Sequence, residues 1–273
     1  MTLIPRLVTS ALVTSTLVTS TLVAFTLQTQ NAYAITPLKF CFEDTSQAPW
    51  TQPDGTGLNI ELLRRVEQRL NEKFEITSKP WKRCLEEVRL GVQDGLIGSA
   101  ASTERRQFSV FPSTPEGKDD RSAALNDDWA RVYIRTDSKV HWNGKNLSNV
   151  KQPVLVQRAY LIGKILQEKG FQIKEVRTIH DALSALADGS AEVAILQSTE
   201  AENLAKYDSS IKHKIAISPQ AFIALAMYLP INRQTHARDP RRIQAIWDAI
   251  REVRASSEYR QLLTAHGVQF EAR

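Results

Sequence analysis

Cysteine is scarce in this chain: Cys41 and Cys84 are the only two among 273 residues. Two cysteines by themselves cannot supply the ligands of a structural zinc site. The sequence also lacks His-Glu-x-x-His, Gly-x-Ser-x-Gly and a phosphate-binding loop, and its five histidines are scattered. We therefore expect no cofactor and no metal, and an enzyme is the less favoured class. A cysteine nucleophile or a pair of carboxylates stays open as its chemistry.

A block of basic residues is missing as well. The chain carries 35 Lys and Arg against 30 Asp and Glu, and this net charge of +5 is spread along its length. Such a mild, dispersed excess offers no patch for a phosphate backbone, so nucleic acid is not an expected partner.

Charge is nearly absent before Lys39, where Arg6 stands alone. An apolar run rich in Leu, Val, Ala and Thr covers residues 7–27, and a polar segment ending in Ala32-Tyr33-Ala34 follows. These features are typical of a secretory signal peptide. We expect residues 1–34 to be removed after Ala34 and the protein to act in the periplasm. A membrane anchor is the alternative, which the Thr and Ser hydroxyls of the run weaken.

In an exported protein, a pair of cysteines meets an oxidising environment, which favours a disulfide. Closing the loop between Cys41 and Cys84 would stabilise the fold by about 4 kcal/mol in the chain-entropy model. Two buried free thiols are the alternative.

Strands and helices alternate after the predicted signal peptide. Residues 38–42, 74–77 and 94–100 are expected to be strands, and residues 58–70 and 81–90 helices, the latter ending at a glycine. Alternation at this spacing predicts an α/β fold with a parallel sheet.

The alternation then restarts, which predicts a second βα unit. It contains expected strands at 132–134, 154–156, 173–176 and 193–196, and expected helices at 161–169 and 181–187. The chain ends in helices, one after Asp239-Pro240 with an apolar stripe for the core and one over residues 259–265. Since no Gly/Ser-rich tether separates the units, we expect extended crossings between them.

Several short motifs resemble the extracytoplasmic solute-binding proteins of family 3, which serve polar amino acid ABC transporters. The resemblance covers residues 38 to about 267. Its most specific part is Gly91-Val92-Gln93-Asp94-Gly95-Leu96-Ile97 followed by Ser102-Thr103-Glu104-Arg105. Weaker parts are Ala48-Pro49-Trp50, Gly57-Leu58-Asn59-Ile60-Glu61-Leu62, Pro80-Trp81, Val154-Leu155-Val156-Gln157 and Gly189-Ser190-Ala191-Glu192-Val193-Ala194.

The resemblance implies the type II periplasmic-binding-protein fold, with two βα lobes and a ligand cleft between them. Residues 35–129 and 225–273 would form one lobe and residues 130–224 the other, with crossings near Ala130 and Ala224. It also implies hinge closure on a small-molecule ligand, an ABC permease as partner and a monomer.

The same resemblance implies a set of ligand-binding residues. Arg105 matches the arginine that grips a ligand carboxylate, a geometry that suits the two parallel donors of a guanidinium. Ser102 could cap a short helix beside it, and Ser99 lies just upstream. Trp50 stands where the family places an aromatic wall over the ligand. The alternatives are a surface arginine in a charged turn and a tryptophan packed beneath a loop.

This sequence departs from the family pattern in the second half of the site. Ala100 replaces a threonine that shares the carboxylate, and Gln197 replaces the aspartate that holds the ligand's amino group. Ala159-Tyr160 stands in place of a Gly-Thr pair, and Arg158 adds a positive candidate. These changes argue against a standard α-amino acid and favour an anionic or carboxylate-bearing solute. Arg83 is a weaker candidate, expected to be solvated.

We therefore expect a periplasmic solute-binding protein that delivers its ligand to an ABC transporter. A sensory module that reports to a membrane receptor needs the same ligand-driven closure, so the residues do not separate the two. A scaffold that binds nothing small is a further alternative.

Overall fold

The computed structural model describes residues 1–2, 36–197 and 199–268. The predicted signal peptide and its cleavage site lie outside the described residues. Within the described ranges, no helix is both long and apolar enough to cross a membrane.

The first sheet has five strands in the order β2-β1-β3-β13-β5. Its parallel part contains β1 (Leu38–Glu43), β2 (Phe74–Lys79) and β3 (Gly95–Leu96). Strand β13 (Ile231–Asn232) lies antiparallel between β3 and β5 (Ser109–Val110). The first sheet therefore combines strands from the first part of the described chain with β13, which follows the strands of the second sheet in sequence.

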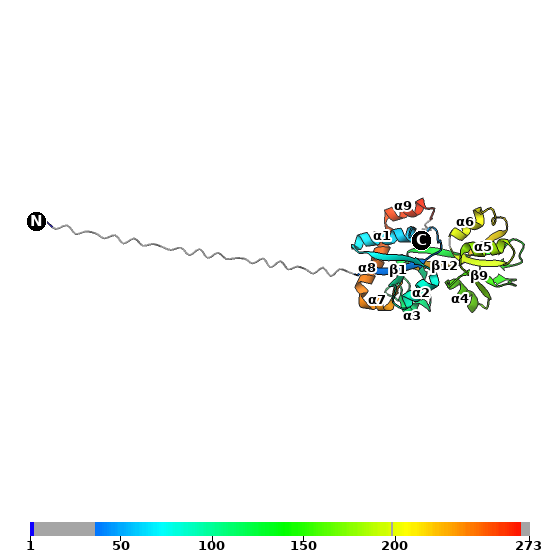
Figure 1. Cartoon of the computed structure of the whole chain (residues 1–273), viewed down its shortest axis with the longest axis horizontal. Helices are drawn as coiled ribbons and strands as arrows, with labels where there is room; N and C mark the ends of the chain where they lie inside the picture. The colour runs from blue at the N-terminus through cyan, green and yellow to red at the C-terminus, as the bar shows by residue number, and fades with distance from the viewer. Residues whose placement is uncertain (3–35, 198, 269–273) are drawn as a thin grey trace. The chain divides into compact units, whose positions relative to one another are not determined.

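Helices surround this sheet, as Figure 1 shows. They are α1 (Leu58–Leu70), α2 (Trp81–Arg89), α3 (Arg105–Phe108), the 3-10 helix η1 (Arg121–Ala123), α7 (Arg233–Arg238), α8 (Pro240–Ala255) and α9 (Ser257–Ala265). Asp239 caps α8 by accepting a hydrogen bond from the Arg242 N–H. The predicted stripe of α8 packs into one apolar core with β1 and α1, and Tyr259 and Leu263 of α9 join it.

The second sheet has six strands in the order β10-β9-β11-β6-β12-β4. They are β4 (Ser99–Ala100), β6 (Asn126–Arg135), β9 (Val154–Gln157), β10 (Ile173–Val176), β11 (Val193–Gln197) and β12 (Ile215–Tyr228). Helices α4 (Leu161–Glu168), α5 (Ile179–Ala187) and α6 (Thr199–Tyr207) cover it (Figure 1). A small hairpin, β7 (His141–Trp142) and β8 (Leu147–Ser148), forms a separate two-stranded sheet, and Trp142 packs in the apolar core of the second sheet.

Strands β6 and β12 form a long antiparallel ribbon that reaches from one sheet to the other. Trp129 and Ala224 are partners in its register, and Ala130 lies opposite Ile223. At the start of β6, the Asn126 side chain accepts a hydrogen bond from Asn59 of α1 over 2.9 Å. The ribbon's far part pairs with β11 through Ala130 to Ile134. One stretch of β6 therefore touches helices and strands of both halves.

Most predicted elements are confirmed, with ends shifted by a few residues. The prediction of one strand over residues 94–100 is wrong: the chain forms β3 in the first sheet and β4 in the second. Gly98 has φ +79°, a left-handed conformation that breaks an extended strand. The predicted parallel pairing is confirmed for β1, β2 and β3 and for β9, β10 and β11. Strands β6, β12 and β13 add antiparallel neighbours that were not predicted. Strand β12, whose pairing with β6 contains two register shifts, was not predicted.

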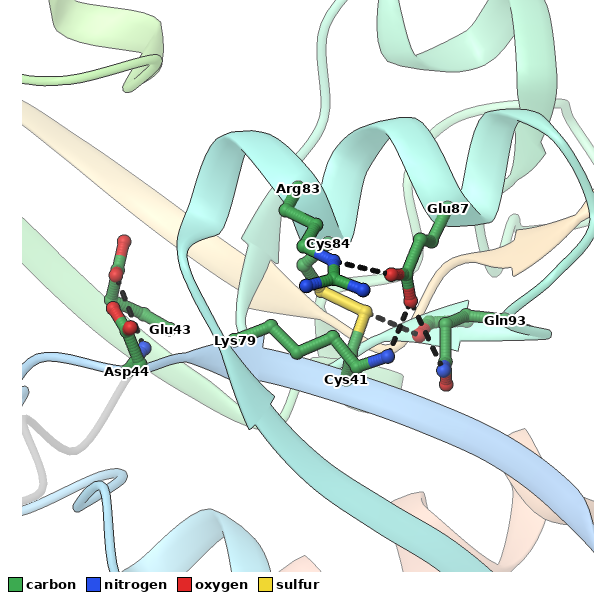
Figure 2. The surroundings of a disulfide bond; sticks show 9 residues. Cys41, Glu43, Asp44, Lys79, Arg83, Cys84, Glu87 and Gln93 are labelled. Carbon is green, nitrogen blue, oxygen red and sulfur yellow. Dashed lines mark hydrogen bonds and ion pairs between the residues drawn. A yellow bond between two sulfur atoms is a disulfide. The ribbon is translucent and has the colours of Figure 1, made fainter.

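The predicted disulfide between Cys41 and Cys84 is present, and the alternative of two free thiols is wrong. The bond joins β1 to α2, and both cysteines are fully buried. Figure 2 shows Lys79, Arg83 and Gln93 beside it, each bonded to the Glu87 carboxylate on α2. These contacts hold α2 against β1 and β2, and α2 begins with Trp81 of the candidate site.

Candidate functional site

A cavity of about 40 Å³ lies where residues of both sheets meet. It is small: a single water needs roughly 10–15 Å³ of such volume. Its polar and aromatic lining residues are Glu43, Gln47, Trp50, Thr51, Asn59, Trp81, Arg105, Asn126, Asp128, Tyr160 and Gln197.

Arg105 lines this cavity and is only 7% exposed, so the alternative of a surface arginine is wrong. Its Nη1 atom donates to the Ser99 hydroxyl over 3.2 Å and to the Ala100 carbonyl over 2.9 Å. The guanidinium carbon lies 5.4 Å from the centre of the Trp81 ring. Among the described residues, its Nε and Nη2 atoms have no hydrogen-bond partner. They can therefore donate to a ligand.

Burial lowers the pKa of the Arg105 guanidinium to about 10, and the nearby Tyr160 and Glu104 side chains oppose that change. The guanidinium therefore stays positive at neutral pH. A buried positive group with unused donors is the arrangement that binds a carboxylate.

Two carboxylic acids line the same cavity. Burial raises the pKa of Asp128, on β6, to about 7, even though it accepts hydrogen bonds from the Trp129 N–H and from Gln197. Burial also raises the pKa of Glu43, on β1, to about 8, and the adjacent Asp44 carboxyl adds to this. Both groups are thus poised to become charged when a cation enters.

The neutral Gln197 therefore does not leave the cavity without acidic groups, because Glu43 and Asp128 line it. Gln197 lines the cavity as expected, and its Nε2 atom donates to Asp128 Oδ2 over 3.1 Å. The carboxylate that Gln197 lacks is supplied from the neighbouring strand, because β11 pairs with β6 and brings the two side chains together.

Trp50 also lines the cavity and lies in a tight turn that precedes α1. Its N–H donates to the Gln47 carbonyl over 2.8 Å, and its carbonyl accepts from the Asn59 N–H over 2.9 Å. Only 8% of Trp50 is exposed, and its ring also belongs to the apolar core of the first sheet. It both packs in the core and faces the cavity.

Side chains from the two halves meet around the cavity. The Trp81 and Tyr160 rings form an edge-to-face pair with centres 6.3 Å apart. Farther out, Glu104 pairs with Lys164 of α4 at 3.5 Å. Burial, together with the charges of Glu43 and Asp128, raises the Tyr160 pKa well above its usual value, so its hydroxyl stays neutral.

Three other predicted residues lie outside the cavity lining. Ser99 is fully buried and holds Arg105. Ser102 lines an outer groove and accepts a hydrogen bond from the Arg105 N–H over 3.2 Å, but the N-cap residue of α3 is Glu104. Arg158 is exposed and lies 3.9 Å from Glu175. Arg83, expected to be solvated, is exposed and paired with Glu87.

Ala159 stands where the family pattern has a glycine, and its backbone adopts a conformation that glycine favours. Its φ is 60°, the left-handed region that glycine adopts most readily. The Ala159 N–H donates to Glu175 Oε1 over 3.1 Å, which holds the turn before α4. This hydrogen bond helps to hold a left-handed backbone conformation at a residue other than glycine.

Sequence reasoning missed Glu43, Asn59, Trp81 and Asp128 as site residues. A signal for Asp128 was available, because in β6 the buried face alternates through Asn126, Asp128, Ala130 and Val132. Polar residues at buried positions of an alternating strand indicate a polar site. No comparable signal marks Glu43. Across the described ranges, no cluster of three or more His, Cys, Asp or Glu is placed to hold a metal.

Comparison with known proteins is consistent with this geometry. The family described as bacterial extracellular solute-binding proteins, family 3, matches residues 38–269. No curated protein sequence matches the chain.

Solved structures with the same fold include a histidine kinase sensor domain with similarity to periplasmic binding proteins. It has a TM-score of 0.69 at 15% identity, over 84% of this chain and 95% of its own. The GluR0 ligand-binding core from Nostoc punctiforme, solved with L-glutamate, gives 0.66 at 14% identity, over 85% and 100%. The arginine-, lysine-, histidine-binding protein ArtJ from Geobacillus stearothermophilus gives 0.65 at 18% identity, over 85% and 96%. The fold is thus the two-lobed type II periplasmic-binding-protein fold.

Proposed function

Because this chain belongs to family 3 of the bacterial extracellular solute-binding proteins, we propose that it captures a small solute bearing both a carboxylate and a cationic group. The observation that carries this proposal is the presence of Arg105, Glu43 and Asp128 around one cavity. The captured solute is delivered to an ABC permease in the inner membrane.

Each end of such a solute has a chemical partner. The unused guanidinium donors of Arg105 suit a carboxylate, with the Trp81 ring behind them. Asp128 and Glu43 suit an ammonium or guanidinium group, whose charge stabilises their ionised forms. A purely anionic solute would leave these two acids facing a negative charge, so we narrow the sequence-based expectation to a zwitterionic or similar molecule.

Capture proceeds by closure of two lobes. We propose that residues 35–129 and 225–273 form one lobe and residues 130–224 the other. The separate apolar cores of the two sheets support this division. The β6–β12 ribbon, with Trp129 opposite Ala224, is the proposed hinge. The protein acts as a periplasmic monomer after loss of residues 1–34.

We further propose that the protein binds its solute without transforming it. Glu43 and Asp128 are the carboxylates that could act as acid and base, and in this proposal both instead bind the cationic group of the solute. Incubation with the bound solute tests this: the solute is expected back unchanged, and a new product in mass spectrometry would assign catalysis to the cavity.

A sensory role is the second candidate, because the fold is shared with a histidine kinase sensor domain. Neighbouring genes separate the two roles. A permease and an ATPase nearby support transport, whereas a lone sensor kinase or cyclase supports signalling.

The experiment that tests the proposed capture is a thermal-shift screen of the purified protein against amino acids, organic acids, polyamines and small peptides. A ligand at a hundred times its Kd should stabilise the protein by about 2.7 kcal/mol. Shifts are expected only from molecules that carry both charges. A shift from simple organic acids alone, or from no compound, would contradict the proposal.

A further inference from the structure

Three polar atoms of residues that line the cavity have no hydrogen-bond partner in the described part of the protein. They are Gln47 Nε2, Trp50 Nε1 and Asn59 Oδ1. These residues are 8%, 8% and 1% exposed, and all line the cavity. A buried polar group without a partner costs about 1–3 kcal/mol, so such a cluster needs an explanation.

The three side chains stand on a rigid backbone. Gln47 and Thr51 form a bridge, with the Gln47 N–H donating to the Thr51 carbonyl over 2.9 Å. The Trp50 carbonyl accepts from the Asn59 N–H over 2.9 Å. A Cβ at Gly57 would lie 2.5 Å from the Trp50 carbonyl oxygen, which shows how closely the turn packs on the start of α1. The backbone that carries the three side chains is therefore held in place by main-chain contacts.

The hydrogen-bonding roles of two of these atoms are fixed. The indole Nε1 of Trp50 can only donate. The Asn59 amide is oriented by its neighbour: Asn59 Nδ2 donates to Asn126 Oδ1 over 2.9 Å, and Asn126 Nδ2 donates to the Asp127 carbonyl over 3.3 Å. Asn59 Oδ1 must then be the unused acceptor. The Gln47 amide carries both a donor and an acceptor.

We propose that Gln47, Trp50 and Asn59 form a second subsite that binds an uncharged group able both to accept and to donate a hydrogen bond. A carboxamide or a hydroxyl meets this requirement. A carboxylate would leave Asn59 Oδ1 unpaired and facing negative charge, and an ammonium offers no acceptor to Trp50 Nε1. An apolar side chain would leave all three atoms unsatisfied. This inference rests on the proposed function, since it describes a third group of the same solute beside its carboxylate and its cationic group.

The proposed subsite gives a reason for the unpartnered polar atoms of Gln47, Trp50 and Asn59 in the cavity lining. Tyr133 also has a buried hydroxyl with no partner in the described residues, but it lies in the core of the second sheet, away from the cavity lining. It provides a matched control, because its substitution by phenylalanine removes the same kind of atom without touching the site.

Calorimetry with sets of amino acids of similar shape tests the subsite. The sets are L-asparagine with L-aspartate and L-leucine, L-glutamine with L-glutamate and L-methionine, and L-threonine with L-valine. In at least one set, the amide or hydroxyl member is expected to bind at least about tenfold more tightly than its partners, because the site's buried polar atoms reject analogues that leave them unpaired. Gln47→Leu and Trp50→Phe are each expected to reduce that preference by roughly fivefold or more.

The ratio of affinities within a set is the decisive readout, because a general loss of packing would weaken all members alike. The ligand-free Gln47→Leu protein should melt no lower than the wild type, and Tyr133→Phe should leave every affinity unchanged. Equal affinity within all sets, or a ratio unaltered in both variants, overturns the subsite while leaving the proposed function intact. Absence of binding by every compound overturns the proposed function and the subsite with it.

Discussion

The side-chain amide of Gln197 donates a hydrogen bond to the carboxylate of Asp128 over 3.1 Å, deep in the cavity between the two sheets. The two residues are 69 positions apart and lie on adjacent antiparallel strands. The family pattern places an aspartate at the position of Gln197, whereas in this protein the acidic group is Asp128 on the neighbouring strand. The contact leaves Asp128 as a weakly acidic group that a cation could ionise.

Asp128→Asn should weaken binding of a zwitterionic ligand by at least about 30-fold, since it removes one partner of a buried charge pair. The fold should be retained, because Asn has the same shape and can still bond to Gln197. Calorimetry measures the loss. Asp137→Asn, at an exposed site, is the control and should bind normally. Equal affinities in both variants would remove Asp128 from the site.

Arg105→Lys should also reduce affinity by at least about 30-fold, because a lysine cannot give a carboxylate two parallel donors. The adjacent Arg106 offers a matched control: it pairs with Asp119 at the surface and does not line the cavity. Arg106→Lys should therefore leave affinity within about twofold, the scale of a surface ion pair. A similar loss in the two variants would indicate a general effect on stability instead of a ligand contact.

The contribution of Asp128 and Glu43 to the stability of the ligand-free protein should increase as the pH falls from about 8 towards 5. Their pKa values are raised from 3.8 to about 7 and from 4.5 to about 8, so the folded state binds protons that the unfolded chain has released. This contribution is full below the unfolded pKa values and is lost as the pH rises through the folded ones.

Ligand affinity should change in the opposite direction, falling below about pH 7 as protons compete with the cation. Melting and calorimetry at several pH values check both trends. The difference between the wild type and a double Glu43→Gln, Asp128→Asn variant isolates these two groups from other carboxylates whose pKa values are lowered, such as Asp120. Parallel pH curves for wild type and variant would show that neither acid titrates as described.

Replacement of Cys41 and Cys84 by serine should destabilise the protein by about 4 kcal/mol on the chain-entropy estimate for this loop. That corresponds to a fall in melting temperature of roughly 10 °C for a chain of this size. Scanning calorimetry under oxidising conditions measures it. The ligand should bind more weakly as well, since the bond fastens α2, which carries Trp81, to the strand that carries Glu43. Identical melting of wild type and variant would mean that the bond contributes nothing.

The elements with strong local patterns could be predicted from the sequence. The apolar spacing of α1, the glycine after α2 and the Asp239-Pro240 start of α8 each encode a helix within a few residues. Short strands such as β9 and β11 were visible as apolar runs. Strand β12 was not, because its register shifts near Ala221 interrupt the alternation on which such a prediction depends.

The composition and motifs of the sequence by themselves determined the class of protein, an α/β chain with a cysteine pair that can bond, and they indicated Arg105 as the residue expected to contact a carboxylate. Only the tertiary structure decided the chemistry of the rest of the site. Pairing of β6 with β11 sets Asp128 beside Gln197, and the tight turn before α1 buries Trp50 and Asn59 with unused polar atoms. The physical reason is that burial and hydrogen-bond partners, which set the charge and the binding capacity of a side chain, come from residues far apart in the sequence.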